Sequence, residues 1–297
     1  MDNNTINVNG NPINLINYLQ QINEENLLDE KKELCTQINA LYDLYFNKII
    51  PKYVNKINSN SNLKYINSYI MVTFGYGKEI ALLQQLEWNN SIQSLSRDLL
   101  ECYSYAKKLI SLYDNVSDFN EYIKNLILID MKQDLKIYYA LISDTTIHDS
   151  KKKDSDIHSI IVRFENLLKK YFPEAANSID IRNKNKSIFK IIRKLKEAYD
   201  NKFPENNDKS KFIGSMLENN VAWKNSETSC YDGCYIIYRE LCHMTHNSIS
   251  SIQARTVRDG LYMLNNDSPN VAAALSLDYW CMRDIYEEMI RIYEKIN

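Results

Sequence analysis

The stretch Leu63–Trp88, LKYINSYIMVTFGYGKEIALLQQLEW, decides the fold class of this chain. Its first half is rich in β-branched and aromatic residues, which favour a strand, and Gly75 and Gly77 could interrupt a helix. The stretch is too long for an ordinary strand, however, and its second half, KEIALLQQLEW, is typical of a helix. We therefore predict a helix over residues 63–87.

The rest of the chain also favours helices. Only 6 of its 297 residues are Gly and 5 are Pro, whereas β-sandwiches and barrels need many turn residues. Pro12 suits the first turn of a short helix. Apolar residues at helical spacing predict further helices over about 28–56, 91–113, 118–143, 156–171, 184–202, 251–264 and 269–295. The expected fold is all-α, an irregular multi-helix bundle of about eight to ten helices.

Polar segments divide these helices. The run Asn58–Asn62 is a connector, so we expect an N-terminal helical segment over residues 1–60 and a larger helical domain over residues 61–297. The stretch 144–155, which contains DTTIHDSKKKDS, is loop-like and predicts a weak seam within that domain.

Composition limits where the protein works and what it binds. A net charge of -2 gives no global nucleic-acid or membrane pattern, so any polyanion site must be local. The N-terminus has no signal-peptide pattern, and the apolar runs are shorter than the roughly 18 residues of a membrane span. The six cysteines lie in helical segments, which favours reduced thiols. The abundance of Asn, Ile, Lys and Tyr resembles bacterial low-GC codon usage. We expect a bacterial, cytoplasmic protein without a membrane partner.

Chemically useful residues concentrate in Tyr231–Ser248, YDGCYIIYRELCHMTHNS. On a helix, Arg239, His243 and His246 lie at i, i+4 and i+7, and seven residues at about 100° each return to one face. An arginine holds a phosphate through charge-assisted hydrogen bonds, and an imidazole moves a proton near neutral pH. Together they suffice for metal-independent RNA cleavage by attack of the 2′-OH. The alternative is that these are surface residues and satisfied core groups.

Arg239-x6-His246 resembles the R-x4–6-H motif of HEPN domains, which are all-helical bundles. Many HEPN proteins are metal-independent endoribonucleases of bacterial toxin–antitoxin and phage-defence systems. The resemblance implies a HEPN-like core, RNA as substrate, and a homodimer in which two motif helices build one site. It also implies an antitoxin or defence-system protein as partner, and catalysis by Arg239 and His246 with help from His243. Glu240 stands where the family commonly has Asn, Asp or His.

A second resemblance pairs this helix with an earlier one. Arg97-x-x-x-Glu101 and a later Y-R-x-L-x-x-x-x-H pattern are similar to two helices of an uncharacterised bacterial all-α domain family. The later pattern comprises Tyr238, Arg239, Leu241 and His246. Arg97 and Glu101, at i and i+4, can pair with each other, and Glu101 can also hold Arg239 or His246 in place. The alternative is a structural ion pair that locks two helices. Both alternatives predict that Arg97 and Glu101 lie near Arg239.

Neither a metal nor a cofactor is expected. Cys230, Cys234, Cys242, His243 and His246 are the candidate zinc ligands. On one helix, however, Cys234 and His243 are separated by about 13.5 Å of rise, which is too far for one ion. Cysteines that fill small gaps in the core are the better explanation.

The segment Arg182–Lys202 is rich in basic residues. Phe189, Ile192, Leu195 and Tyr199 form its apolar stripe, and the cations expected to face an RNA backbone are Lys190, Arg193, Lys194 and Lys196. The alternative is a solvated, lysine-rich helix face.

The leading hypothesis is therefore a metal-independent endoribonuclease of toxin or phage-defence type. The competing hypothesis is a non-catalytic helical interaction or nucleotide-sensing module in which the Arg, Glu and His residues are structural.

Overall fold

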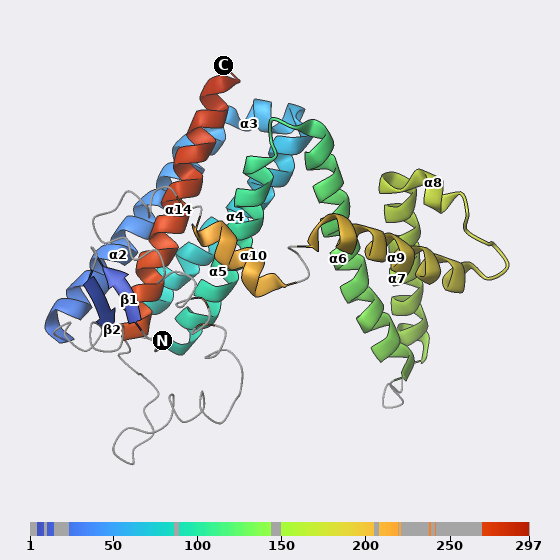
Figure 1. Ribbon diagram of the computed structural model, residues 1–297, viewed down its shortest axis with the longest axis horizontal. Coiled ribbons are helices and arrows are strands. Elements are labelled where there is room, and N and C mark those ends of the chain that lie inside the picture. Colours follow the sequence, from blue (N-terminus) through green and yellow to red (C-terminus); the bar gives the residue numbers. More distant parts are fainter. Residues whose placement is uncertain are drawn as a thin grey trace, which may run out of the picture. The chain divides into compact units, whose positions relative to one another are not determined.

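The computed structural model describes residues 5–8, 11–14, 24–85, 89–143, 150–204, 208–218, 220, 238, 241 and 269–296. Within these ranges the regular elements are helices apart from one short hairpin, so the predicted all-α fold is confirmed (Figure 1). The helices form two compact units, unit 1 with residues 1–113 and 209–297 and unit 2 with residues 114–208. The predicted division at residue 60 and the predicted seam at 144–155 remain predictions.

The hairpin lies near the N-terminus. Strands β1 (Thr5–Val8) and β2 (Asn11–Asn14) pair antiparallel, with Asn7 opposite Pro12. Pro12 therefore belongs to a strand and not to the first turn of a helix. The chain carries Asn9–Gly10 between the two strands, the dipeptide favoured in two-residue hairpin turns. This local pattern explains why a hairpin forms here in an otherwise helical chain.

Unit 1 is built around the C-terminal helix, which packs against three others. Among the described residues its continuous helices are α2 (Glu24–Leu44), the π-helix η1 (Tyr45–Ile49), α3 (Ile50–Ser59), α4 (Ser61–Gln85), α5 (Asn89–Ser111), α10 (Lys209–Glu218) and α14 (Pro269–Lys295). Helix α14 lies against α2, α4 and α5, and α4 packs along α5 (Figure 1). The predicted helix over 63–87 is confirmed as α4.

Helix α4 is buried on the face expected from its apolar spacing. Ile66, Ile70 and Phe74 recur every four residues and are fully buried. Gly77 is also buried, and a Cβ at that position would lie 2.4 Å from Met282 Sδ of α14. The missing side chain thus lets α14 approach α4 closely, which explains a glycine inside this helix.

Pro51 changes the helical register without ending the helix. Directly before it, the π-helix η1 forms, and the N–H of Ile50 donates to the carbonyl of Tyr45 five residues back. A proline removes one backbone donor and its ring needs room in the preceding turn, so the wider π turn accommodates it. The helical path then continues to Ser59, and Asn60 alone separates α3 from α4.

The described residues of unit 2 form four helices around a core of their own. They are α6 (Val116–Ser143), α7 (Ser150–Tyr171), α8 (Pro173–Ala176) and α9 (Lys184–Lys202). Helix α9 has the predicted bounds, whereas α7 begins at Ser150 and not at Asp156. Apolar residues of α6, α7 and α9 fill the core: Leu128, Met131, Leu135, Tyr138, Ile161, Phe164, Leu168, Ile188, Phe189 and Ile192.

None of the helices in the described ranges is long and apolar enough to cross a lipid bilayer.

Candidate functional site

All three predicted catalytic residues, Arg239, His243 and His246, lie outside the described part of the chain, as does the supporting residue Glu240. Their roles remain predictions. Two residues of the same stretch are described. Tyr238 and Leu241 are both helical and both buried, each at 2% exposure. Their spacing of three residues is that of one helix face.

Tyr238 reaches the pair of residues that the sequence singles out on α5. Its hydroxyl donates to Glu101 Oε1 at 3.4 Å, and Arg97 Nε lies 3.4 Å from the same oxygen. Lys209, the first residue of α10, places its Nζ 2.5 Å from Glu101 Oε2. We call these four residues, Arg97, Glu101, Lys209 and Tyr238, the Glu101 cluster. It brings together three predicted site residues and adds Lys209.

The Glu101 cluster is partly buried. The side chain of Glu101 is 16% exposed and that of Arg97 is 27% exposed, whereas that of Lys209 is 51% exposed. A carboxylate with donors on both oxygens is held in one orientation, and charge-assisted bonds of this kind are stronger than neutral ones. Glu101 can therefore position its neighbours but has little freedom to act as a base itself.

Neighbouring groups remain protonated near neutral pH. Burial raises the pKa of the Cys102 thiol to about 11, and Glu101 and Asp98 add to the shift. Burial also raises the pKa of Tyr76, with further contributions from Cys102 and Asp98. A thiol with such a pKa is a poor nucleophile. Cys102 is therefore a packing residue and not a candidate nucleophile.

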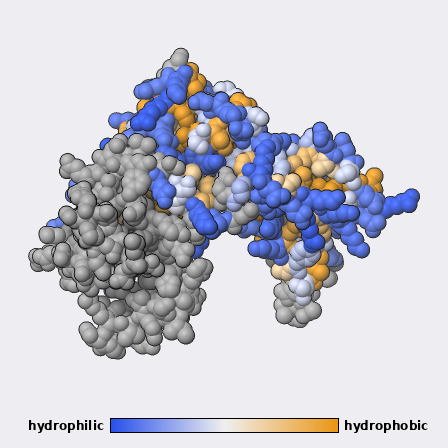
Figure 2. All heavy atoms as spheres, viewed as in Figure 1, coloured by the Kyte–Doolittle hydropathy of each residue, from blue (hydrophilic) through white to orange (hydrophobic). Residues whose placement is uncertain are grey.

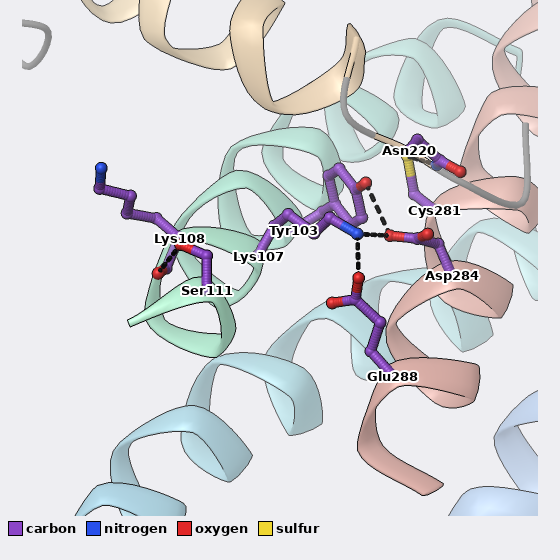
Figure 3. Close-up of polar contacts among 8 residues, drawn as sticks. All are labelled: Tyr103, Lys107, Lys108, Ser111, Asn220, Cys281, Asp284 and Glu288. Atoms are coloured by element: carbon purple, nitrogen blue, oxygen red, sulfur yellow. Dashed lines mark hydrogen bonds and ion pairs between the residues drawn. The ribbon is translucent and has the colours of Figure 1, made fainter. Parts of the chain in front are cut away.

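A second polar cluster joins α5 to α14, and the sequence did not indicate it. Lys107 Nζ lies 2.6 Å from Asp284 Oδ2 and 2.5 Å from Glu288 Oε1, and the Tyr103 hydroxyl donates to Asp284 Oδ2 at 3.0 Å (Figure 3). Lys107 and Asp284 are 7% and 2% exposed. Burial raises the pKa of Glu288, and Lys107 partly opposes that shift. With its cation fully engaged, this cluster is suited to locking two helices.

A third polar group, Asp278 on α14, is fully buried. Its Oδ2 accepts a hydrogen bond from the Ser96 hydroxyl at 2.5 Å, while its Oδ1 has no hydrogen-bond partner among the described residues. Burial raises the pKa of Asp278 to about 8, although the bond from Ser96 opposes this shift. Burial raises the pKa of the Cys35 thiol on α2 to about 12, and the nearby Asp278 adds to this shift. Asp278 is therefore mostly a neutral acid at pH 7.

The basic face of α9 holds three of the four predicted cations. Lys190, Arg193 and Lys194 are exposed and line an open depression of about 470 Å³. Lys196 differs from the prediction, because it is 8% exposed and forms an ion pair with Asp200 on the same helix. Lys196 lies on the buried side of α9, with Ile188 and Ile192, and therefore does not belong to the exposed cations.

In the part of the chain that the structure describes, no group of three or more His, Cys, Asp or Glu residues could hold a metal ion. Cys35, Cys102 and Cys281 are free thiols. The candidate zinc ligands, Cys230, Cys234, Cys242, His243 and His246, all lie outside the described residues.

Comparison with known proteins adds no relative: no family model, curated protein or solved structure matches this chain.

Proposed function

We propose that this chain is a metal-independent endoribonuclease of bacterial toxin or phage-defence type, with a HEPN-like core. The observation that carries the proposal is the contact of Tyr238 with Glu101. Tyr238 directly precedes Arg239 in the chain, and Glu101 is the residue that the sequence assigned to hold Arg239 or His246. The cluster thus supports a positioning role for Glu101 beside the motif.

Each motif residue has one role in the proposed reaction. His246 accepts the proton of an RNA 2′-OH, whose oxygen forms a bond to the neighbouring phosphorus while the bond to the 5′-oxygen breaks. Arg239 binds the phosphate oxygens and stabilises their added charge, and His243 supplies the proton to the departing 5′-oxygen. The products are a 2′,3′-cyclic phosphate and a 5′-hydroxyl. The same proposal includes a cytoplasmic homodimer and an antitoxin or defence-system partner.

Cleavage of single-stranded RNA in EDTA tests this function. Purified protein is expected to yield fragments that end in 2′,3′-cyclic phosphate, and His246→Ala is expected to abolish them without lowering the Tm. His158→Ala is the matched control, because His158 is exposed on α7 of unit 2. Intact RNA with the wild-type protein would refute the proposal, as would equal losses with both histidine variants.

The alternative is a non-catalytic module in which the cluster is structural. It is favoured by the number of partners of Glu101, since two ion pairs, with Arg97 and Lys209, and the hydrogen bond from Tyr238 converge on one carboxylate. Glu101→Gln separates the two functions. A positioning role predicts slower cleavage beyond any change in Tm, whereas a purely structural role predicts a lower Tm only. A nucleotide-sensing module would instead show a higher Tm with a nucleotide.

A further inference from the structure

The depression on unit 2 gathers positive charge around one exposed aromatic ring. Four cations line it, together with Tyr139 of α6 and a single carboxylate, that of Glu197. The cations are Lys186, Lys190, Arg193 and Lys194, all on α9 and all exposed. Hydrophilic residues cover much of the visible face of this unit in Figure 2. The depression therefore carries a local charge of +3, in a chain whose net charge is -2.

The cations in the depression differ from the other basic residues of α9. Lys184, Lys196 and Lys202 each form an ion pair with a carboxylate of unit 2. Lys186, Lys190 and Lys194 form no ion pair with any residue in the described ranges. They recur every four residues, so they follow one face of the helix with a rise of about 6 Å between successive positions. Such a row suits a chain of evenly spaced negative charges.

Tyr139 is held in place beside this row. Its hydroxyl accepts a hydrogen bond from Arg193 Nη2 at 2.8 Å, and its ring centroid lies 6.0 Å from that of Phe189. Tyr139 is 43% exposed, although its side chain is large and mostly hydrophobic. A fixed, exposed ring next to a row of cations has the two features by which proteins bind single-stranded nucleic acids: backbone charges on the cations and bases stacked on the aromatic ring.

We propose that this depression binds single-stranded RNA, with a base stacked on Tyr139 and backbone phosphates on Lys186, Lys190 and Lys194. The inference deepens the proposed function and rests on it for the choice of RNA, because DNA offers the same phosphates and bases. Single strands are favoured over duplexes because paired bases are unavailable for stacking. Arg193 both orients the ring and adds charge.

Binding is measured by fluorescence anisotropy of the full chain with a labelled, single-stranded 2′-O-methyl RNA, which cannot react through its 2′-oxygen. Tyr139→Ala is expected to raise the Kd about ten-fold, since it removes the ring on which a base stacks. Tyr139→Phe keeps the ring and is expected to change the Kd less than about three-fold. A larger loss in Tyr139→Ala is then due to the missing ring and not to the missing hydroxyl. Lys190→Gln is expected to reduce the slope of log K against log salt by about 0.7.

Two further variants serve as controls. Glu197→Gln removes the one carboxylate and is expected to lower the Kd, an effect opposite to general destabilisation. Lys170→Gln makes the same charge change as Lys190→Gln on the exposed side of α7 and is expected to leave the salt slope unchanged. Single-stranded DNA of the same sequence distinguishes the two sources of the polymer, and RNA that binds no tighter than DNA overturns the choice of RNA.

Other outcomes overturn the inference itself. They are unchanged RNA binding by Tyr139→Ala, equal affinity for duplex RNA, or binding to phosphatidylserine vesicles in place of RNA. A separate assay with unmodified RNA keeps the two proposals distinguishable. Binding without cleavage contradicts only the ribonuclease, and cleavage that does not depend on Tyr139 or Lys190 contradicts only this binding surface.

Discussion

Substituting Gly77 by alanine tests the packing of α4 against α14. The new methyl group would lie 2.4 Å from Met282 Sδ and 2.9 Å from its Cε. Carbon atoms pack best at about 3.5–4.0 Å, so the Met282 side chain has to move by about 1 Å or more. Sδ and Cε are the far end of a flexible, fully buried side chain, so Met282 has to relieve the clash by changing its rotamer within the core. Overpacking of this kind costs about 1–3 kcal/mol.

Gly75 provides the matched control two residues away. A Cβ at Gly75 meets no atom within 4 Å, so Gly75→Ala adds only the helix propensity of alanine, worth about 0.8–1.0 kcal/mol. The same gain applies to Gly77→Ala and cancels in the comparison. We therefore expect Gly75→Ala to be more stable than Gly77→Ala by about 1–3 kcal/mol, the cost of overpacking alone.

The assay is urea unfolding followed by circular dichroism, with the free energy of unfolding compared between the two variants. Repeating both substitutions in a Met282→Ala background removes Sδ and Cε, the two atoms of the clash. In that background Gly77→Ala is expected to match Gly75→Ala within about 0.5 kcal/mol. Equal effects of the two alanines in the wild-type background would refute the proposed close approach of α14.

Three more predictions concern charged groups. Asp278 has a folded-state pKa of about 8, above its usual value, so the free energy of unfolding should fall by about 1.4 kcal/mol per pH unit as pH rises from 4 to 8. Asp278→Asn should flatten this slope in pH-dependent urea unfolding, and an unchanged slope would contradict the assignment. Lys107→Met leaves the buried Asp284 and the partly exposed Glu288 without this cation, and should lower the free energy of unfolding by about 3–5 kcal/mol. A loss below about 1 kcal/mol would contradict the view that this cluster locks α5 to α14. Burial opposes the ionisation of Glu121, but donors from two lysines and a tyrosine outweigh it and lower its pKa to about 2. Its contribution is therefore present above about pH 4.5 and lost as pH falls through 2, so Glu121→Gln should cost about 1 kcal/mol at pH 7 and nothing near pH 2 in thermal unfolding.

Local patterns predict much of the secondary structure in the described ranges. Helices α9 and α14 have the predicted bounds because prolines and polar residues mark their ends. Strand propensity at residues 63–74 is overridden in α4, since burial of its apolar face contributes more than the small difference in propensity. The hairpin at residues 5–14 differs from the helix predicted to begin at Pro12, because Pro12 and the apolar residues after it are compatible with either a helix start or a strand.

The sequence alone determines that this chain is helical, and it identifies Arg97 with Glu101 as a pair, because both properties depend on spacing within one helix. Only the tertiary structure decides which cations and acids meet. Lys209 reaches Glu101 across 108 residues of chain, and Lys107 meets Asp284 across 177. Lys196 and Lys194 look alike in the sequence, yet one is buried and the other exposed, because the packing of α9 in unit 2 selects which face is covered. Contacts between helices that are distant in the sequence depend on how their faces pack, and a local pattern of residues does not predict that packing.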